Sequence, residues 1–264
     1  MDEIANFGNE VRQNIAGLAH DSDFRKQSID WIIAANSHRY TYNFSSLGRP
    51  VIQFPQDIIA MQELIWRIKP DLVIETGIAH GGSLVASAAA LALLDYCEAV
   101  EAGTSLDPKA SRRRVLAVDI DIRPHNRAAI EAHPLSHMIE MIQGSSIDPE
   151  IVAQVAKRAG NFSTVLVSLD SNHTHDHVLG ELDAYAHLTS VGSYCVVFDT
   201  LIEDMPADMF TDRSWGVGNN AKTAVWSYLD QASKTYGPKF EIDRELEAKL
   251  SITVAPDGYL KRTA

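Results

Sequence analysis

The residues best suited to chemistry begin with a glycine-rich loop, Glu75-Thr-Gly-Ile-Ala-His-Gly-Gly-Ser83, which follows a short apolar run. Glycines let a chain turn tightly and approach a ligand closely. The spacing G-x-x-x-G-G is not the dinucleotide fingerprint G-x-G-x-x-G, and no Gly-Lys-Ser/Thr follows, which excludes a P-loop. The loop indicates a nucleoside-like ligand, unless it is only a tight turn. Its candidate binding residues are Glu75, Gly77, His80, Gly81 and Ser83.

Two later loops carry side chains that suit the same ligand. Asp119 ends the next apolar run, where a carboxylate can accept both hydroxyls of a ribose. Ser145 and Ser146 follow the third run, where small residues suit contact with the edge of an adenine ring. Each loop could also be an ordinary connection, and Ser146 could cap the next helix. Together the three loops predict one nucleoside site.

Two more carboxylates, Asp170 and Asp199, follow the fourth and fifth apolar runs. Both would face one crevice, where a divalent cation could bridge them to substrate oxygens, although each could instead cap a helix or turn. His173 could serve as a general base because a free imidazole has a pKa near 6.5. We therefore predict Asp170 and His173 as catalytic residues. Trp215 lies in a segment rich in Gly and Asn, which predicts a lid or an acceptor loop, unless the segment is an ordinary loop that caps a helix.

The run His173-Thr-His175-Asp-His177 allows a different interpretation. It resembles the H-x-H-x-D-H zinc motif of metallo-β-lactamase-like hydrolases, but it is one residue shorter and comes late in the chain. A metal-dependent hydrolase is therefore one alternative. An NAD(P)-linked oxidoreductase is a weaker one because the dinucleotide fingerprint is missing.

These loops need a scaffold, and the apolar runs predict one. Short runs that alternate little predict strands covered on both faces, at 72–75, 115–119, 138–142, 164–169 and 194–198. Predicted helices lie between them, at 82–96, 125–132, 148–158 and 176–188. This alternation predicts an α/β fold with a parallel sheet. We further expect a helix near 220–233, late strands at 240–242 and 251–254, and a turn at 256–258.

The N-terminal part has a different pattern. We expect a helix that starts at 21–23, then an aromatic loop at 40–55, and then a helix that Asp57 caps and Pro70 ends. This order predicts a mainly helical extension. We expect two units, the extension with its aromatic loop at 1–59 and a catalytic domain at 60–264.

Composition excludes several classes of function. The 264 residues carry a net charge of −12, which repels nucleic acids and anionic lipid. Two cysteines and an acidic N-terminus without an apolar run predict a cytoplasmic protein without a signal peptide. Residues 76–94 contain no Asp, Glu, Lys or Arg and nominally reach the length of a membrane span. Their first residues include three Gly and a His, so we predict a loop and a buried helix, with no membrane span.

Five runs, taken in order, resemble the cephalosporin hydroxylase family: ETGIAHGGS, VDIDIRPHN, IQGSSID, LDSNHTHDHVLGEL and GSYCVVFDT. The flanking runs YNFSSLGRPVIQFPQD and WGVGNNAKTAVWSYL extend the resemblance over roughly residues 40–260. The resemblance implies the Rossmann-like fold of class I methyltransferases that use S-adenosylmethionine (SAM), a mostly parallel seven-stranded sheet with helices on both faces. It also implies transfer of a methyl group to a hydroxyl, assisted by magnesium.

The resemblance also implies roles for single residues. The SAM loop matches at Glu75, Gly77 and Gly81, the ribose carboxylate at Asp119, and the adenine loop at Ser145 and Ser146. Asp170 matches the first metal ligand and is expected to contact SAM as well.

One position departs from the family pattern. The family has Glu-Asp where this chain has Phe198-Asp199, and a ring cannot bind a cation. The metal site would then consist of Asp170 and Asp199, with Glu203 or Asp204 as a substitute ligand; the alternative is that no metal is bound.

These observations predict a SAM-dependent O-methyltransferase, with Mg²⁺ as an assisting cation. The acceptor would be a hydroxyl of a sugar, glycan or secondary metabolite. We expect a small-molecule or glycan partner, no nucleic acid, and a homo-oligomer. A non-catalytic SAM-binding scaffold is the remaining alternative, because Phe198 replaces a carboxylate.

Overall fold

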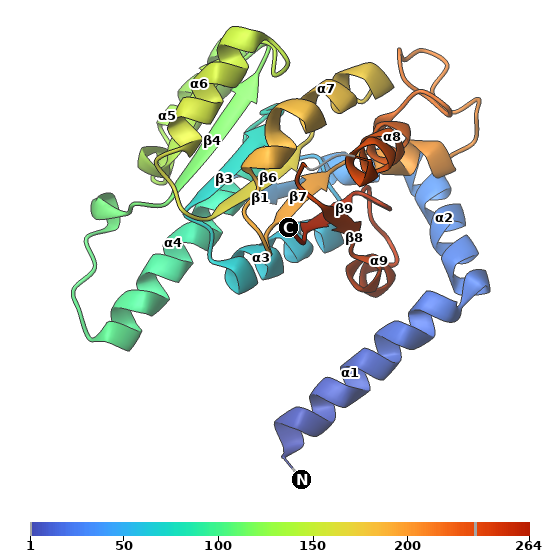
Figure 1. The fold of residues 1–264 in the computed structure, drawn as a ribbon, viewed down its shortest axis with the longest axis horizontal. Helices are drawn as coiled ribbons and strands as arrows, with labels where there is room; N and C mark the ends of the chain where they lie inside the picture. Colours follow the sequence, from blue (N-terminus) through green and yellow to red (C-terminus); the bar gives the residue numbers. More distant parts are fainter. Residues whose placement is uncertain (1, 235–236) are drawn as a thin grey trace.

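The structure is a computed structural model, and it describes residues 2–234 and 237–264. Its centre is a seven-stranded sheet in the order β5-β4-β3-β6-β7-β9-β8 (Figure 1). Strands β3 to β7 run parallel, and β9 is antiparallel to both β7 and β8. The strands are β3 (Leu72–Thr76), β4 (Arg114–Asp119), β5 (Ile139–Gln143), β6 (Val165–Leu169), β7 (Tyr194–Val197), β8 (Phe240–Ile242) and β9 (Tyr259–Arg262). A separate hairpin pairs β1 (Phe44–Ser46) with β2 (Arg49–Val51).

Helices cover both faces because alternate residues of each strand point to opposite sides. Val73 of β3 belongs to one apolar cluster, while Leu72 and Ile74 belong to the other. The first cluster lies under α3 (Pro55–Ile68), α4 (Gly82–Ala102), α5 (Pro124–Glu131) and α9 (Arg244–Leu250). The second lies under α6 (Pro149–Ala159), α7 (His175–Tyr185) and α8 (Ala221–Ser233). Short 3-10 turns are η1 (Tyr40–Asn43), η2 (Pro108–Ala110), η3 (Ser136–Met138), η4 (Ala186–Leu188) and η5 (Thr200–Asp204).

The predicted fold class is confirmed, and the five predicted parallel strands and the helices between them are present. The predicted strand at 251–254 is wrong: this segment is a loop, and the last strand is β9, beyond the turn at 256–258. Backbone groups of the loop bind other elements. The amide of Val254 donates to Asp57, and its carbonyl accepts from Leu201.

The predicted capping role of Asp57 is also wrong. Helix α3 begins at Pro55, with Phe54 as its cap, and Asp57 is fully buried. Its carboxylate accepts hydrogen bonds from the Val254 amide at 2.9 Å and the Tyr259 hydroxyl at 2.7 Å, and from the Thr253 hydroxyl. Burial raises the pKa of Asp57 to about 6. This carboxylate ties the C-terminal strand to α3.

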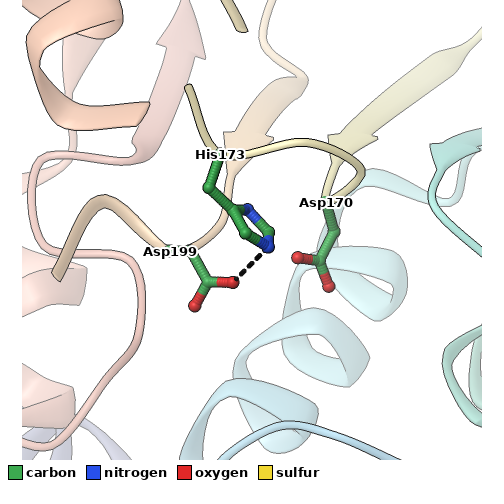
Figure 2. A group of neighbouring side chains, drawn as sticks. All are labelled: Asp170, His173 and Asp199. Carbon is green, nitrogen blue, oxygen red and sulfur yellow. Dashed lines mark ion pairs between the residues drawn. The ribbon is translucent and has the colours of Figure 1, made fainter. Parts of the chain in front are cut away.

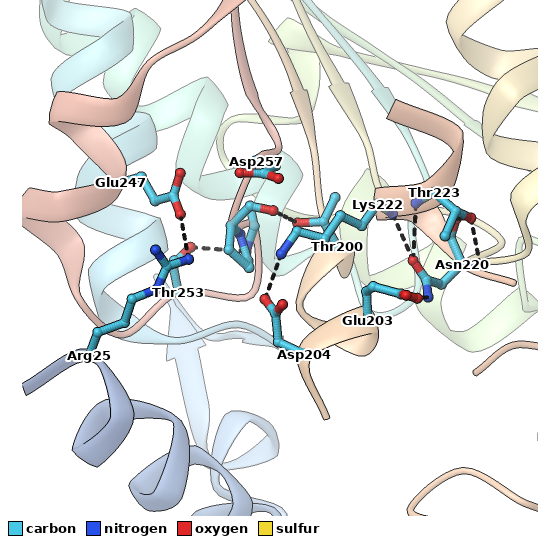
Figure 3. A network of polar contacts seen from close by, with 12 residues as sticks. Arg25, Thr200, Glu203, Asp204, Asn220, Lys222, Thr223, Glu247, Thr253 and Asp257 are labelled. Atoms are coloured by element: carbon cyan, nitrogen blue, oxygen red, sulfur yellow. Dashed lines mark hydrogen bonds and ion pairs between the residues drawn. The ribbon is translucent and has the colours of Figure 1, made fainter. Parts of the chain in front are cut away.

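The N-terminal extension begins with α1 (Glu3–His20) and α2 (Ser22–Asn36). Helix α1 has no buried residue; it packs against α9, and its N-terminal end projects from the rest of the molecule (Figure 1). Helix α2 reaches the body through Ile32 in the first apolar cluster and through Arg25, whose guanidinium lies 3.4 Å from Glu247 (Figure 3). The boundary expected between residues 59 and 60 falls inside α3, which packs on α4.

Within the described residues, one helix is long and apolar enough to cross a membrane: α4. In the structure Leu84, Ala88 and Leu91 of α4 are fully buried in the first apolar cluster. The predicted helix is therefore present, with one face buried and Leu93 and Val100 exposed on the other.

Candidate active site

The loops singled out in the sequence meet at one edge of the sheet, where the parallel strands end. The strand order reverses at β3, which lies between β4 and β6, and ligands of open α/β sheets bind beside such a reversal. The loop that follows β3 donates the amide of Gly77 to the carbonyl of Val118 at 2.8 Å. On its other side, the amide of Asp170 donates to the carbonyl of Thr76 at 2.9 Å. The glycine-rich loop thus lies between the loops that carry Asp119 and Asp170.

Gly77 is required by this close approach. Its φ is +89°, a left-handed conformation that side chains rarely adopt. A Cβ atom there would lie closer than 3.0 Å to the carbonyl oxygen of Asp170. The glycine therefore fixes the distance between the first loop and Asp170, a role that the protein needs with or without a ligand.

Two residues that the sequence reasoning missed hold the remainder of this loop. Arg49 of β2 donates two hydrogen bonds to the carbonyl of His80, at 2.9 and 2.6 Å, and one to Asn126 at 3.0 Å. Asn126, which is buried on α5, donates to the carbonyl of Ala79 at 2.8 Å. A Cβ on Gly82 would be too close to the carbonyl of Pro50, and a Cβ on Gly81 too close to Ile130. The predicted residue His80 thus contributes through its carbonyl.

Asp119 lies at the same loop, as predicted from its position at the end of β4. Its Oδ2 accepts from the amides of Ile78 at 2.7 Å and Ala79 at 3.3 Å, and its Oδ1 accepts from the amide of Asp121 at 2.9 Å. These bonds fix the carboxylate beside the glycine-rich loop. The side chain stays partly exposed, so its remaining lone pairs can face a ligand.

The first turn of α4 provides further donors. Gly81 is the N-cap of α4 and has no side chain to accept hydrogen bonds, so the first amide groups of the helix remain available at the loop. Ser83 in this turn donates to Glu75 and lowers the pKa of that carboxylate, as does Ser87 at 2.6 Å. Burial raises the pKa of Glu75 and outweighs the two hydrogen bonds from the serines, so the net shift is upward. Glu75 lines a cavity of about 210 Å³ between α3 and α4.

The two serines of the third loop differ. Ser145 is partly exposed after β5, whereas Ser146 is buried and its hydroxyl lies 3.0 Å from Nε2 of His177. The Ser146 side chain therefore faces α7, and its contact with His177 holds the third loop against that helix.

Three side chains form the centre of the site. One ligand atom from each of Asp170, His173 and Asp199 lies within 4.8 Å of the others. Nε2 of His173 is 3.0 Å from Oδ2 of Asp199 and points between the two carboxylates (Figure 2). Asp199 has a φ of +57°, which is uncommon for an L-residue and brings its carboxylate to this place. We call these three residues the Asp-His-Asp cluster.

The electrostatics of this cluster favour a cationic ligand. Burial raises the pKa of Asp170 well above its usual value, and the nearby carboxylates of Asp199 and Glu75 raise it further. Gln53 donates a hydrogen bond to Asp170 and acts in the opposite direction. The two carboxylates offer the oxygen ligands that Mg²⁺ prefers, so the cluster fits the metal that the sequence suggests, and the imidazole beside them can accept a proton.

Neither predicted substitute ligand joins the cluster. Oε2 of Glu203 accepts from the amide of Gly218 at 2.7 Å and from Asn220 at 2.6 Å, and Asp204 pairs with Lys222 at 2.6 Å (Figure 3). Phe198 is buried in the first apolar cluster. Among the described residues, the third member of the cluster is His173.

Trp215 lies beside the cluster, where a lid was predicted. Its ring contacts His173 edge-on at 5.5 Å between centroids and Phe210 at 4.8 Å. The bonds from Glu203 to Gly218 and Asn220 hold the end of this loop.

The other two histidines of the run have separate partners. His175 contacts the hydroxyl of Thr223 at 2.8 Å, and His177 contacts Ser146. In the described residues the three imidazoles do not converge on one point, which argues against the predicted alternative of a zinc hydrolase.

The fold and these loops define a class I SAM-dependent methyltransferase: a mostly parallel seven-stranded sheet with one antiparallel strand, a glycine-rich loop after the central strand, and carboxylates at the neighbouring strand ends. A family model described as rhamnosyl O-methyltransferase/CmcI matches residues 38–263. The chain belongs to this family, which confirms the resemblance seen in the sequence, and its enzyme class is O-methyltransferase.

Relatives support the same assignment. The chain is 28% identical over 211 residues to rhamnosyl O-methyltransferase of Mycobacterium tuberculosis H37Rv, covering 78% of this chain and 73% of the relative. It is 25% identical over 237 residues to rhamnosyl O-methyltransferase of Mycobacterium leprae, covering 87% and 90%. The apo-structure of CmcI-N160 resembles the fold with a TM-score of 0.50 at 16% identity, over 84% of this chain and 77% of that one.

Proposed function

We propose that this protein transfers the methyl group of SAM to a hydroxyl oxygen of a sugar, within a glycan or a glycosylated metabolite. The observation that carries the proposal is the Asp-His-Asp cluster, whose ligand atoms lie within 4.8 Å of one another beside the glycine-rich loop. The sugar acceptor is inferred from the mycobacterial relatives, which are named rhamnosyl O-methyltransferases.

In this proposal the first three loops bind the cofactor. When bound, SAM supplies a methyl group activated by its positively charged sulfur. Asp119 accepts the ribose hydroxyls, the Ser145 loop contacts the base, and the uncapped amides of α4 face the amino-acid end. The acidic surroundings of Asp170 and Glu75 suit both positive charges of SAM.

The cluster then acts on the acceptor. Asp170 and Asp199 would hold Mg²⁺, which would lower the pKa of a bound hydroxyl. His173 accepts the hydroxyl proton, and Asp199, whose Oδ2 lies 3.0 Å from Nε2 of that ring, stabilises the resulting imidazolium. Trp215 covers this face, orients the sugar by stacking and excludes water. The cytoplasmic location and the homo-oligomer remain predictions.

Methyl transfer from labelled SAM to a panel of rhamnosides and other glycosides, with and without Mg²⁺, tests the proposal. We expect a methyl ether on a sugar oxygen. Asp170→Ala should abolish turnover and leave binding of S-adenosylhomocysteine (SAH) largely intact, whereas Asp176→Ala, an exposed carboxylate on α7, should change neither. Turnover of Asp170→Ala within about tenfold of wild type would show that the catalytic role of the cluster is wrong.

A further inference from the structure

Helix α7 carries a partly buried polar network that connects two loops of the site. Nε2 of His177 lies 3.0 Å from the hydroxyl of Ser146 and 3.3 Å from that of Ser171. It also lies 3.6 Å from Oε1 of Glu181, one turn further along α7. Ser171 follows Asp170 directly, and Ser146 belongs to the third loop. One imidazole nitrogen thus contacts both the loop predicted to hold the base and the loop of the Asp-His-Asp cluster.

The hydrogen-bond directions follow from the groups themselves. The hydroxyl of Ser171 donates to Oε1 of Glu181 at 2.6 Å, so its single hydrogen is already used. Toward His177 the Ser171 oxygen can therefore only accept, which makes Nε2 the protonated nitrogen. The oxygen of Ser146, 3.0 Å from Nε2, is then within reach of the same N–H. His177 is then a donor to both serines.

Other contacts show that α7 is shaped to hold the third loop. The hydroxyl of Tyr185, one further turn along, donates to the carbonyl of Ser146. A Cβ on Gly180 would lie 3.1 Å from the side chain of Ile147 in that loop. Ser146 and Glu181 are both buried, so neither can replace a lost partner with bulk water.

We infer that His177 is a positioning residue for the nucleoside. Its N–H fixes Ser146, and through Ser146 the loop that would contact the adenine of SAM, while the Ser171 bond keeps that loop in register with Asp170. This inference rests on the proposed function, because it concerns the cofactor of that reaction. His177 itself need not touch the ligand.

The test is calorimetric binding of SAH and of 5′-methylthioadenosine, which lacks the amino-acid end. His177→Phe keeps the ring volume but removes the donor, and it should weaken both ligands by about 10-fold, or about 1.4 kcal/mol. His177→Gln keeps an N–H donor and should recover most of the affinity. His175→Phe is the matched control, an identical change two residues earlier at a side chain that contacts Thr223 instead, and it should bind both ligands like wild type.

A double-mutant cycle separates positioning from general loss of structure. If His177 acts through Ser146, then Ser146→Ala with His177→Phe should bind SAH no more weakly than His177→Phe alone. Additive losses, or His177→Phe with wild-type affinity, would overturn the inference. Failure of the wild-type protein to bind SAH would instead contradict the proposed function. Thermal unfolding of each variant checks that it is folded.

Discussion

Replacing Gly77 with alanine should damage the fold and the site together. At this residue φ is +89°, and an added Cβ would lie closer than 3.0 Å to the carbonyl oxygen of Asp170. Gly48 is a matched control: its φ is +87°, but an added Cβ would have no atom within 4 Å. Both variants carry the same backbone strain, and only Gly77→Ala carries the clash.

The expected effect follows from these two terms. Strain at a positive φ costs about 1–3 kcal/mol, and Gly48→Ala should lose that amount of unfolding free energy. The clash cannot be relieved by a flexible side chain, so the Asp170 backbone has to move by about 1 Å. Overpacking of this kind costs a further ~1–3 kcal/mol. A displacement of about 1 Å at a reacting group lowers the rate roughly 100-fold.

Urea unfolding measures the first effect, and methyl transfer from labelled SAM measures the second. We expect Gly77→Ala to be the less stable variant and to lose most of its turnover, while Gly48→Ala keeps wild-type turnover. Equal unfolding free energies for the two variants would refute the claim that close backbone contact at Gly77 positions Asp170.

Three further outcomes are expected. The pKa of Asp57 in the folded state, about 6, exceeds its ordinary value of 3.8, so its contribution to stability is full below about pH 4 and is lost as the pH rises through 6. Urea unfolding at a series of pH values should show up to about 3 kcal/mol of this pH dependence in the wild type and none in Asp57→Asn. Parallel pH profiles for the two proteins would contradict the pKa shift. Trp215→Ala should raise the KM of the acceptor about 10-fold without changing SAH affinity in calorimetry, whereas a weakened SAH affinity would place Trp215 at the cofactor instead. Arg49→Lys cannot donate two hydrogen bonds in the same geometry to the carbonyl of His80, so we expect SAH affinity to fall several-fold. An unchanged affinity would show that this contact does not shape the loop.

Most of the sheet could be predicted from the sequence because its central strands are buried on both faces and are therefore short apolar runs. The last strand, β9, could not be predicted in the same way. Its second half, Lys261 and Arg262, is polar, while the apolar run at 251–254 looked more like a strand. The bond from Val254 to Asp57 decides against that strand, and the two residues are far apart in the sequence.

Part of the site could be predicted because parallel strands end at one edge, so Asp119, Asp170 and Asp199 had to lie there. Contacts that distant elements make with the site could not be predicted from the sequence. Glu203 is close to Asp199 in the sequence, but it binds the loop at Gly218. Arg49 and Asn126 support the glycine-rich loop from β2 and α5, and no local pattern marks them.

A crystal structure of the protein with SAH and Mg²⁺ would show whether the strand ends form the cofactor site. We expect the ribose at Asp119, the base at the loop of Ser145, and the cation between Asp170 and Asp199. SAH bound away from the strand ends, or Asp119 and Asp170 facing separate ligands in that complex, would contradict it.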